Sequence, residues 1–408
     1  TERNYMSKIM VIAGGDWQIE LIKKAKQMGH YVICSNLYED SPAFPYADAC
    51  EVANVLDKEK NLQIAQKYQP DAVISDQSDI AVPTVAYVNE KMGLQGIGTD
   101  KADIFTDKTL MRQRCKEAGL PVPDFKICKT LDDALEMLNK HKKIIIKPID
   151  SQSSRGVYTI TDEKKLRDKF DDTMSYSNRR KEILAEEYIG GDEFTIDGLV
   201  VNGTHYPLCI SIKEMYKENP NVSKVQTYTY SHPVYDYELL RNTNKALVES
   251  IGLPMGLTHS EYKFYKGKFY LIEAGARGGG SNLSGKIVPY MSGVDNYEYL
   301  IKEALGQSVD QKALDQLHLP EQRCVVMRFF DFGEGIVQKV HGKEYLAQHA
   351  NVLDYQLEIH EGDRLENPKY GRLRPGHFIV GADSYDEAQK LAQDILNNVY
   401  VTFEEQKG

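Results

Sequence analysis

The chain has 408 residues, of which 41% are hydrophobic and 27% charged, a composition ordinary for a globular enzyme of several domains. Its formal net charge of -10 leaves no basic excess for phosphates, which argues against a nucleic-acid partner. No apolar run is long enough to cross a bilayer, so a membrane partner is not expected. The cysteines are scattered and form no C-x-x-C pair, which predicts reduced thiols and a cytoplasmic location.

The N-terminal part alternates between strand patterns and helix patterns. Apolar strand runs are predicted at 8–15, 30–36 and 71–77, and amphipathic helices at 17–29 and 58–69. Strands and helices that alternate at this length predict right-handed β-α-β units around a parallel sheet.

The pattern changes after residue 98. A long polar helical region is predicted at 99–119, followed by a proline-marked linker at 120–128. A helix at 131–141, a strand at 142–148 and a strand at 157–160 come next.

Longer strands dominate the rest of the chain. Antiparallel strands are predicted at 183–189, 192–203 and 204–215, then a helix at 237–252 and a hairpin at 257–275 that turns at Lys266-Gly267. The tail is predicted to add strands near 324–332 and 377–383 and a closing helix at 384–401.

The hairpin runs into the sequence F-Y-L-I-E-A-G-A-R-G-G-G-S, residues 269–281. Its G-x-x-G-G-G spacing differs from the G-x-G-x-x-G of a dinucleotide-binding turn. Glu261 and Glu273 lie on its two strands, roughly opposite each other, at positions that can face the same side. Two facing carboxylates repel unless a cation lies between them, and Mg²⁺ is the oxygen-seeking cation that accompanies ATP phosphates. The alternative is an exposed hairpin with an acidic face.

The positions of two lysines and the composition of one loop predict an anion-binding site. Lys147 ends the apolar strand I-I-I-K-P, where an ammonium group without a partner would be costly to bury. The sequence S-Q-S-S-R-G at 151–156 supplies N–H groups and hydroxyls that can cradle an anion; an exposed loop is the alternative. Lys108 lies in a D-K-x-x-M-R string, where a solvated helix lysine is the alternative interpretation.

In this order and spacing, the motifs resemble the ATP-grasp superfamily, in the branch that contains amino-acid ligases and purine-biosynthesis ligases. The resemblance covers nearly the whole chain and implies a mixed α/β and α+β fold. Its parts would be a Rossmann-like (pre-ATP-grasp) domain at 1–98, a linker helix and small subdomain at 99–185, a large subdomain with the metal site at 186–306, and a small C-terminal domain at 307–408 that completes the substrate site.

The resemblance also implies cofactors and substrates. ATP and two Mg²⁺ ions would bind, with Mn²⁺ as an alternative metal. The substrates would be a small carboxylate and a small amine, and a homodimer stays open.

The resemblance assigns a role to each motif residue. E-E-Y-I at 186–189 would hold adenine, because a backbone edge offers both a donor and an acceptor, and Glu193 would accept the ribose hydroxyls. The implied ATP contacts are Lys108, Lys147, Ser153, Ser154, Gly156, Glu186, Tyr188, Ile189 and Glu193. Glu261 and Glu273 would hold the two metal ions, with Glu273 bridging both ions. Lys147 and Arg277 would be catalytic. The implied substrate contacts are Arg277, Gly279, Arg372, Arg374 and Asp79.

The chain departs from relatives in two places. Many relatives have asparagine two residues after the second glutamate, where this chain has Gly275. Purine-type relatives read P-R-P-H-D or P-R-P-H-N after the acid, whereas this chain reads A-R-G-G-G, closer to amino-acid and dipeptide ligases.

We therefore predict an ATP-dependent ligase that joins a carboxylate to an amine through an acyl phosphate and releases ADP and phosphate. The substrate is predicted to be an amino acid or a similar small metabolite. One alternative is a purine-pathway type ligase or formate-using transferase. Another is an inactive nucleotide-binding regulator, which Gly275 permits.

Overall fold

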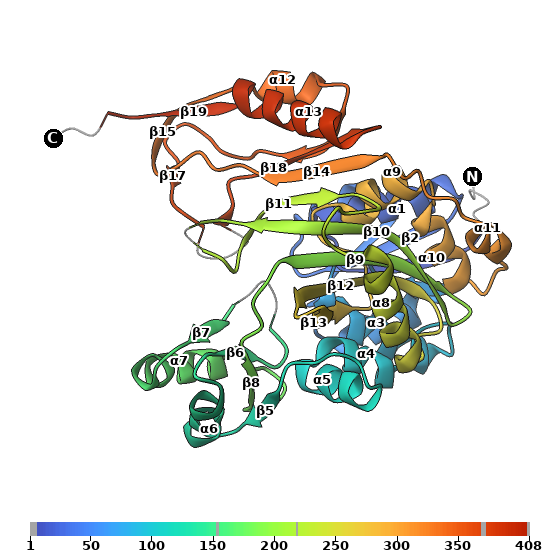
Figure 1. The fold of residues 1–408 in the computed structure, drawn as a ribbon. Coiled ribbons are helices and arrows are strands. Elements are labelled where there is room, and N and C mark those ends of the chain that lie inside the picture. The colour runs from blue at the N-terminus through green and yellow to red at the C-terminus, as the bar shows by residue number, and fades with distance from the viewer. Residues whose placement is uncertain (1–5, 152–154, 218, 369–372, 406–408) are drawn as a thin grey trace.

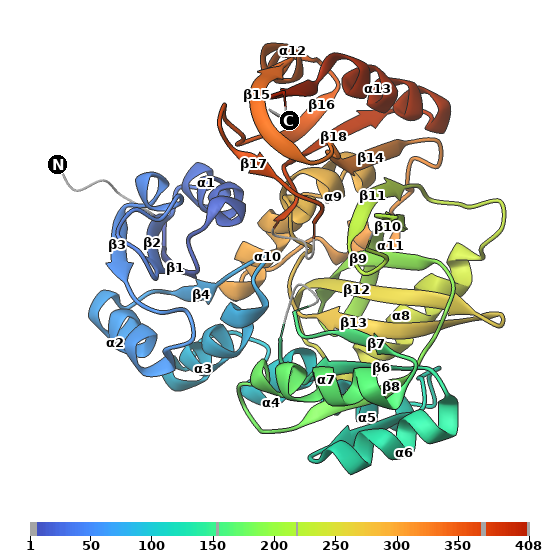
Figure 2. The ribbon, with the colours of Figure 1, turned by 90° about the vertical axis from the view of Figure 1, so that its left-hand side faces the viewer.

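The computed structural model describes residues 6–151, 155–217, 219–368 and 373–405. Figure 2 shows the N-terminal domain in blue at the left, the small subdomain in teal and green at the bottom, the green and yellow strands of the central sheet at the right, and the C-terminal part in orange and red at the top. Figure 1 shows the small subdomain and the C-terminal part at opposite ends of the central sheet.

The N-terminal domain has a four-stranded parallel sheet in the order β3-β2-β1-β4, which confirms the predicted β-α-β arrangement. Alternate residues of β1 are buried in two separate cores, so both faces of this sheet are covered. The elements are β1 (Lys8–Ile12), α1 (Ile19–Gln27), β2 (Tyr31–Asn36), β3 (Ala49–Val52), α2 (Lys58–Tyr68), β4 (Ala72–Ile74), the short η3 (Asp79–Ala81) and α3 (Val82–Met92).

The helical region predicted at 99–119 consists of two helices, α4 (Thr99–Thr106) and α5 (Lys108–Glu117). Asp107 between them has an extended backbone, and its carboxylate accepts the N–H groups of Thr109 (2.9 Å) and Leu110 (3.4 Å). This N-cap ends one helix and begins the next. It also places Lys108 in the first turn of α5.

The small subdomain is an antiparallel sheet in the order β5-β8-β6-β7 with two helices. Its elements are β5 (Phe125–Cys128), α6 (Leu131–His141), β6 (Ile144–Pro148), β7 (Tyr158–Ile160), α7 (Glu163–Ser175) and β8 (Ile183–Glu187). The predicted linker at 120–128 therefore ends in an edge strand. The predicted boundary between residues 185 and 186 cuts through β8, which pairs with β5 and β6, so we place it after Glu187.

The central sheet has eight strands in the order β13-β12-β9-β10-β11-β14-β18-β16. The strands are β9 (Glu193–Val201), β10 (Thr204–Met215), β11 (Ser223–Tyr228), β12 (Gly256–Tyr265), β13 (Lys268–Gly275), β14 (Cys324–Phe329), β16 (Val352–Gln356) and β18 (His377–Ala382). Helix α8 (Tyr237–Ile251) packs its apolar side chains on one face of this sheet. Strands β14, β18 and β16, which belong to the C-terminal domain predicted at 307–408, continue this sheet.

The remaining elements cover the sheet and join it to the N-terminal domain. They are a π-helical turn η4 (Leu283–Ile287), α9 (Val288–Ser292), α10 (Asn296–Ala304), α11 (Gln311–Asp315), α12 (Lys343–Gln348), α13 (Tyr385–Asn398) and a three-stranded sheet of β17 (Arg364–Leu365), β15 (Gly335–His341) and β19 (Tyr400–Phe403). The closing helix predicted at 384–401 ends at Asn398, because the residues after it pair with β15. Within the described ranges, no helix is long and apolar enough to cross a membrane.

Glu303 on α10 makes the stability of the fold depend on pH. Burial raises the pKa of Glu303 to about 7 from 4.5, against the opposing effect of backbone N–H groups of Gly256 and Asn202. Between these two pKa values the folded chain keeps a proton that the unfolded chain has lost, so stability falls as the pH rises through this window. We expect Glu303→Gln to raise the melting temperature at about pH 8 by a few degrees and to flatten its change between about pH 5 and 8. Thermal melts compare the change of melting temperature with pH in Glu303→Gln and in the control Glu321→Gln, which replaces an exposed acid. Equal slopes in both variants would contradict this assignment.

Candidate active site

A buried ionic cluster joins α5 to the small subdomain. Glu186 on β8 is 1% exposed, lies 2.5 Å from Lys147 Nζ and also contacts Arg112 Nε. Burial opposes ionisation of Glu186, but Arg112 and Lys147 outweigh it and hold its pKa at about 2. The buried Lys147 therefore has an anionic partner, as its place in the sequence predicts. Sequence reasoning missed Arg112, because only the fold brings α5 against β8.

Lys108 links the start of the predicted phosphate loop to a predicted metal ligand. Its Nζ donates to the Ser151 carbonyl at 2.8 Å and lies 3.0 Å from Glu273 Oε1. The structure thus brings together three segments far apart in the sequence, which a solvated helix lysine would not do.

The rest of the predicted phosphate loop is described only in part. Ser153 and Ser154 lie outside the described residues, and their roles stay predictions. Gly156 has a φ of +68°, and a Cβ there would lie 2.5 Å from the Tyr176 ring. Packing against Tyr176 alone is enough to require glycine at this position.

Glu261 and Glu273 are directly paired across β12 and β13, so both carboxylates project from the same face of the sheet. A β-bulge after Glu261 creates this pairing, because Tyr262 pairs with Leu271 and Ile272 is the extra residue. Arg112 Nη2 donates to the Ile272 carbonyl at 2.7 Å and so holds the bulge.

The surroundings of the two acids fit Mg²⁺. Both side chains keep some exposure, 26% for Glu261 and 33% for Glu273, so a ligand can reach them. Lys213 Nζ lies 2.9 Å from Glu261 and 2.7 Å from Glu193. Among the residues that the structure describes, no group of three or more His, Cys, Asp or Glu side chains could hold a metal. Two carboxylates suit Mg²⁺, which takes its other ligands from phosphate oxygens and water.

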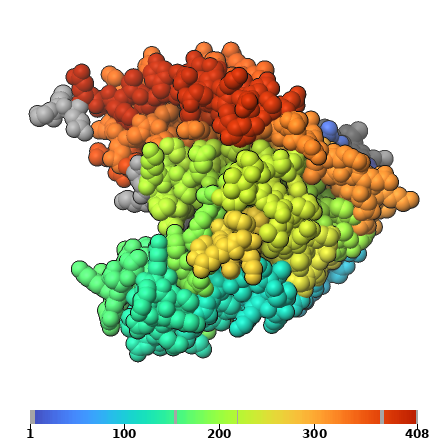
Figure 3. Space-filling model, in the orientation of Figure 1, coloured from blue at the N-terminus to red at the C-terminus, as the bar shows by residue number. Residues whose placement is uncertain are grey.

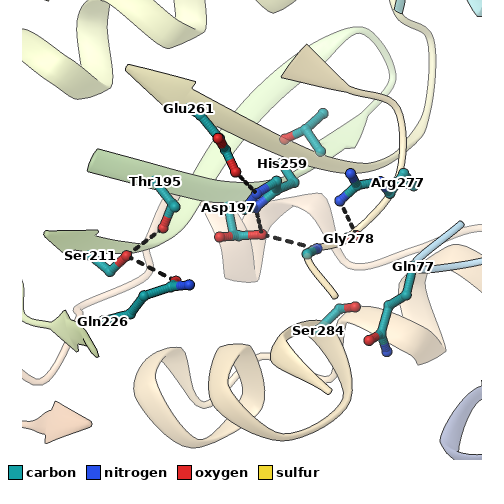
Figure 4. A network of polar contacts seen from close by, with 12 residues as sticks. Gln77, Thr195, Asp197, Ser211, Gln226, His259, Glu261, Arg277, Gly278 and Ser284 are labelled. Carbon is teal, nitrogen blue, oxygen red and sulfur yellow. Dashed lines mark hydrogen bonds and ion pairs between the residues drawn. The ribbon is translucent and has the colours of Figure 1, made fainter. Parts of the chain in front are cut away.

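A histidine connects Glu261 to a second acid (Figure 4). His259 Nδ1 lies 2.9 Å from Asp197 Oδ1, and its Nε2 lies 3.4 Å from Glu261 Oε1. Burial lowers the pKa of His259, but Asp197 and Glu261 outweigh burial and raise it to about 9. Sequence reasoning missed Asp197, His259 and Lys213. The sequence did contain a signal for His259: residues two apart on a strand lie on the same face of the sheet, so His259 must share a face with Glu261.

Arg277 is oriented by Asp79 of the N-terminal domain. Its Nε and Nη2 each donate to one carboxylate oxygen of Asp79 at 2.6 Å, and its Nη1 donates to the Gly278 carbonyl at 2.9 Å. A guanidinium has five N–H groups, so one remains on each terminal nitrogen. A carboxylate or phosphate oxygen can accept these two remaining N–H groups. Because both Asp79 oxygens contact Arg277, the predicted substrate contact of Asp79 stays a prediction.

The residues predicted to hold adenine and ribose lie where the chain passes from β8 of the small subdomain to β9 of the central sheet. Two lysine ammonium groups lie over the ring of Tyr188: Lys143 Nζ at 3.7 Å and Lys263 Nζ at 5.3 Å from the ring centroid. Ile189 is buried. Glu193 is the first residue of β9 and contacts Lys213. Their nucleotide contacts stay predictions. In the space-filling view, the surface is hollowed between the small subdomain and the end of β10 and β11 (Figure 3).

Two further predicted substrate residues have different surroundings. Gly279 donates its N–H to Asp197 at 3.3 Å, and a Cβ there would lie 2.6 Å from Leu283 and 2.9 Å from His259. Arg374 donates to the Ser223 carbonyl at 3.1 Å and lies 3.4 Å over the Phe329 ring, and burial lowers its pKa to about 10. Arg372 lies outside the described residues. The substrate roles of all three stay predictions.

Comparisons with known proteins match two segments of the chain to protein families. Residues 140–284 match the ATP-grasp domain, and residues 328–404 match the L-amino acid ligase C-terminal domain 2. The chain is 29% identical over 191 residues to the formate-dependent phosphoribosylglycinamide formyltransferase of Bacteroides thetaiotaomicron, covering 46% of this chain and 49% of that protein. It is 27% identical over 253 residues to the alanine–anticapsin ligase of Bacillus subtilis, covering 55% of this chain and 52% of that protein. The chain therefore spans about half the length of these curated relatives.

Solved structures show the same fold over almost the whole chain. The L-amino acid ligase from Bacillus licheniformis has a TM-score of 0.82 at 22% identity and covers 99% of this chain and 100% of its own. The phosphoribosylglycinamide synthetase from Anaerococcus prevotii has a TM-score of 0.76 at 19% identity and covers 98% of this chain and 100% of its own. The chain therefore has the fold of ATP-grasp ligases, with a match to the ATP-grasp domain at residues 140–284 and a match to the L-amino acid ligase C-terminal domain 2 at residues 328–404.

Proposed function

We propose that the protein is an ATP-dependent carboxylate–amine ligase. The observation that carries the proposal is one hairpin: it pairs Glu261 with Glu273 and leads directly to Arg277, which keeps one N–H group on each terminal nitrogen. Lys108 connects this hairpin to the predicted phosphate loop. Acids for a metal and cations for phosphates are the groups that phosphoryl transfer requires.

The proposed reaction has two steps. A carboxylate oxygen attacks the γ-phosphorus of ATP, the bond to the β-phosphate oxygen breaks, and an acyl phosphate and ADP form. An amine nitrogen then attacks the acyl carbon, phosphate leaves, and the amine loses a proton as the amide forms.

Each charged residue has a part in holding these groups. Lys108 and Lys147 neutralise ATP phosphates, and Arg277 binds the transferred phosphoryl group or the acyl phosphate. Glu261 and Glu273 hold Mg²⁺, which when bound neutralises charge on the phosphoryl oxygens. Positioning and charge neutralisation account for catalysis, so no serine or cysteine nucleophile is required.

An amino acid or similar metabolite is the proposed substrate. The A-R-G-G-G sequence and the match of residues 328–404 to an amino-acid ligase domain support this choice. The match to a formate-dependent phosphoribosylglycinamide formyltransferase supports a purine-type ligase or formate-using transferase as the second candidate. An inactive regulator is the third, since Gly275 replaces the usual asparagine. A cytoplasmic location and a homodimer remain parts of the proposal.

A screen for ADP release distinguishes the three candidates. The purified chain is given ATP and Mg²⁺ with pairs of amino acids, and in parallel with formate and a ribonucleotide amine. We expect ADP release only with an amino-acid pair, together with a product of matching mass. Release only with formate and the ribonucleotide amine would support the purine-type candidate. Tight ATP binding without ADP release from any pair would support the regulator.

Lys147→Met is expected to weaken ATP binding by roughly 10- to 100-fold, because hydrogen bonds to charged groups contribute about 1.5–3 kcal/mol. The fold should survive, since Arg112 still neutralises Glu186. Calorimetric titration with ATP measures the affinity. Lys343→Met is the matched control, because this half-buried lysine donates to the Ile359 carbonyl at 2.7 Å in the C-terminal part. Equal ATP affinity in the two variants, with normal melting, would refute the role of Lys147.

A further inference from the structure

Asp76, two residues after β4, is buried against the segment that follows the metal-site hairpin. Its carboxylate accepts the Gly278 N–H at 2.7 Å, the Tyr297 hydroxyl at 2.7 Å and the Ser284 hydroxyl. A Cβ at Gly278 would lie 2.2 Å from Ser284 Oγ and 2.9 Å from Asp76 Oδ1. The carboxylate of one domain is thus in close contact with the backbone of another.

Gln77 makes a second set of contacts to the same segment. Its Oε1 accepts the Asn282 N–H at 2.9 Å, and its Nε2 donates to the Tyr297 hydroxyl at 3.1 Å and the Trp17 carbonyl at 3.0 Å. Ser281 and Asn282 both have a φ of +57°, a left-handed conformation that is uncommon outside glycine. Such a conformation persists where surrounding contacts hold it. Figure 4 shows Gln77 and Ser284 beside the stretch that carries Arg277 and Gly278.

We propose that Asp76 and Gln77 are positioning residues that hold residues 277–282, the glycine turn, so that Arg277 faces the reacting phosphoryl group. They act through the turn and through Arg277, and they do not touch the substrate. The N-terminal domain thereby supplies part of the alignment of the active site. This inference rests on the proposed function.

The two ends of β4 provide a matched comparison. Asp71 immediately precedes β4 and accepts the Lys8 N–H at 2.8 Å, which is a contact within the N-terminal domain. Asp76 follows β4 and makes the equivalent contact to the glycine turn. Asp71 is exposed whereas Asp76 is fully buried, so Asp71→Ala controls for the loss of an aspartate beside β4, and a loss of kcat without a change in the KM for ATP identifies Asp76 as a positioning residue.

The first experiment measures kcat and the KM for ATP in Asp76→Ala and Asp71→Ala. We expect Asp76→Ala to lower kcat by about 100-fold, the effect of a displacement of about 1 Å at a catalytic group. The KM for ATP should stay within about twofold, because the proposed ATP contacts Lys108, Lys147 and Glu186 lie on other elements. A mutation that affects only the step after ATP binding lowers kcat and leaves the KM for ATP unchanged. Asp76→Asn should recover most of kcat, since an amide still accepts the Gly278 N–H and donates to the hydroxyls. Asp71→Ala should keep normal kcat.

The second experiment needs no turnover. Trp17 is the single tryptophan of the chain, and a Cβ at Gly280 would lie 3.0 Å from its ring, so its fluorescence reports the position of the glycine turn. We expect a shifted Trp17 emission in Asp76→Ala and an unchanged one in Asp71→Ala and Asp76→Asn. If the wild type releases no ADP with any substrate pair, the proposed function fails, and this measurement still decides whether Asp76 holds the turn.

Two milder variants keep the inference testable if Asp76→Ala does not fold. Ser284→Ala and Tyr297→Phe each remove one hydrogen bond to Asp76, and each should shift Trp17 emission and lower kcat by about tenfold if the turn needs both. Wild-type emission and wild-type kcat in the folded Asp76 variant, or in both milder variants, would overturn the inference.

Discussion

Glu273→Gln is expected to lower turnover by about two to three orders of magnitude, because metal-assisted charge neutralisation contributes several kcal/mol to such a transition state. Glu273 lies opposite Glu261 and 3.0 Å from Lys108, so the variant loses a metal ligand and the partner of a phosphate-binding lysine together. Glu261→Gln should cost less, since this acid is proposed to serve one ion only.

ADP release at saturating Mg²⁺ measures both variants against the wild type. Glu214→Gln is the control, because it removes an exposed acid from β10 of the same sheet. Near-normal turnover in Glu273→Gln would mean that this hairpin is not the metal site, and the ligase proposal would lose its main support.

Arg277→Lys is expected to be nearly as damaging as Glu273→Gln. A lysine is a compact point charge and cannot reproduce the planar fork. It would contact Asp79 or the oxyanion with a single ammonium group, whereas Arg277 uses two nitrogens on Asp79 and keeps an N–H on each terminal nitrogen. ATP affinity should be unchanged, because the proposed work of Arg277 follows nucleotide binding.

Single-turnover ADP formation and ATP titration together check the Arg277 prediction. Arg241→Lys is the control, since Arg241 contacts the Tyr230 carbonyl at 2.8 Å away from the glycine turn. A variant with weakened ATP binding and normal chemistry at saturating ATP would assign Arg277 to nucleotide binding instead.

Local patterns in the sequence predicted those parts of the site that depend on neighbours along the chain. The alternation of strand and helix predicted the parallel sheet, because each element has its own hydrophobic period. Lys147 was predicted to need a partner because three apolar residues precede it. The hairpin at 257–275 was predicted from its strand pattern and its Lys266-Gly267 turn.

The two acids of the predicted metal site face each other for a reason that the local sequence does not reveal. Counted back from the turn without a bulge, Glu261 would pair with Ile272, and Glu273 would project from the other face of the sheet. The extra residue at Ile272 places the acids side by side, and Arg112 from α5 holds its carbonyl. A bulge held by a distant helix leaves no periodic signal in the strand itself.

By itself the sequence determined many of the segments that become strands and helices, and several charged residues that stand at their ends, because propensity, capping and burial period act over a few residues. The tertiary structure alone decided the partners of those charges: Glu186 with Arg112, Asp79 with Arg277, and Asp76 with Gly278, the last two about 200 residues apart. It also decided that one sheet runs from β13 to β16 across the predicted domain boundary. Such pairings form because buried charges and backbone N–H groups require partners once elements pack, and packing joins residues without regard to their distance along the chain.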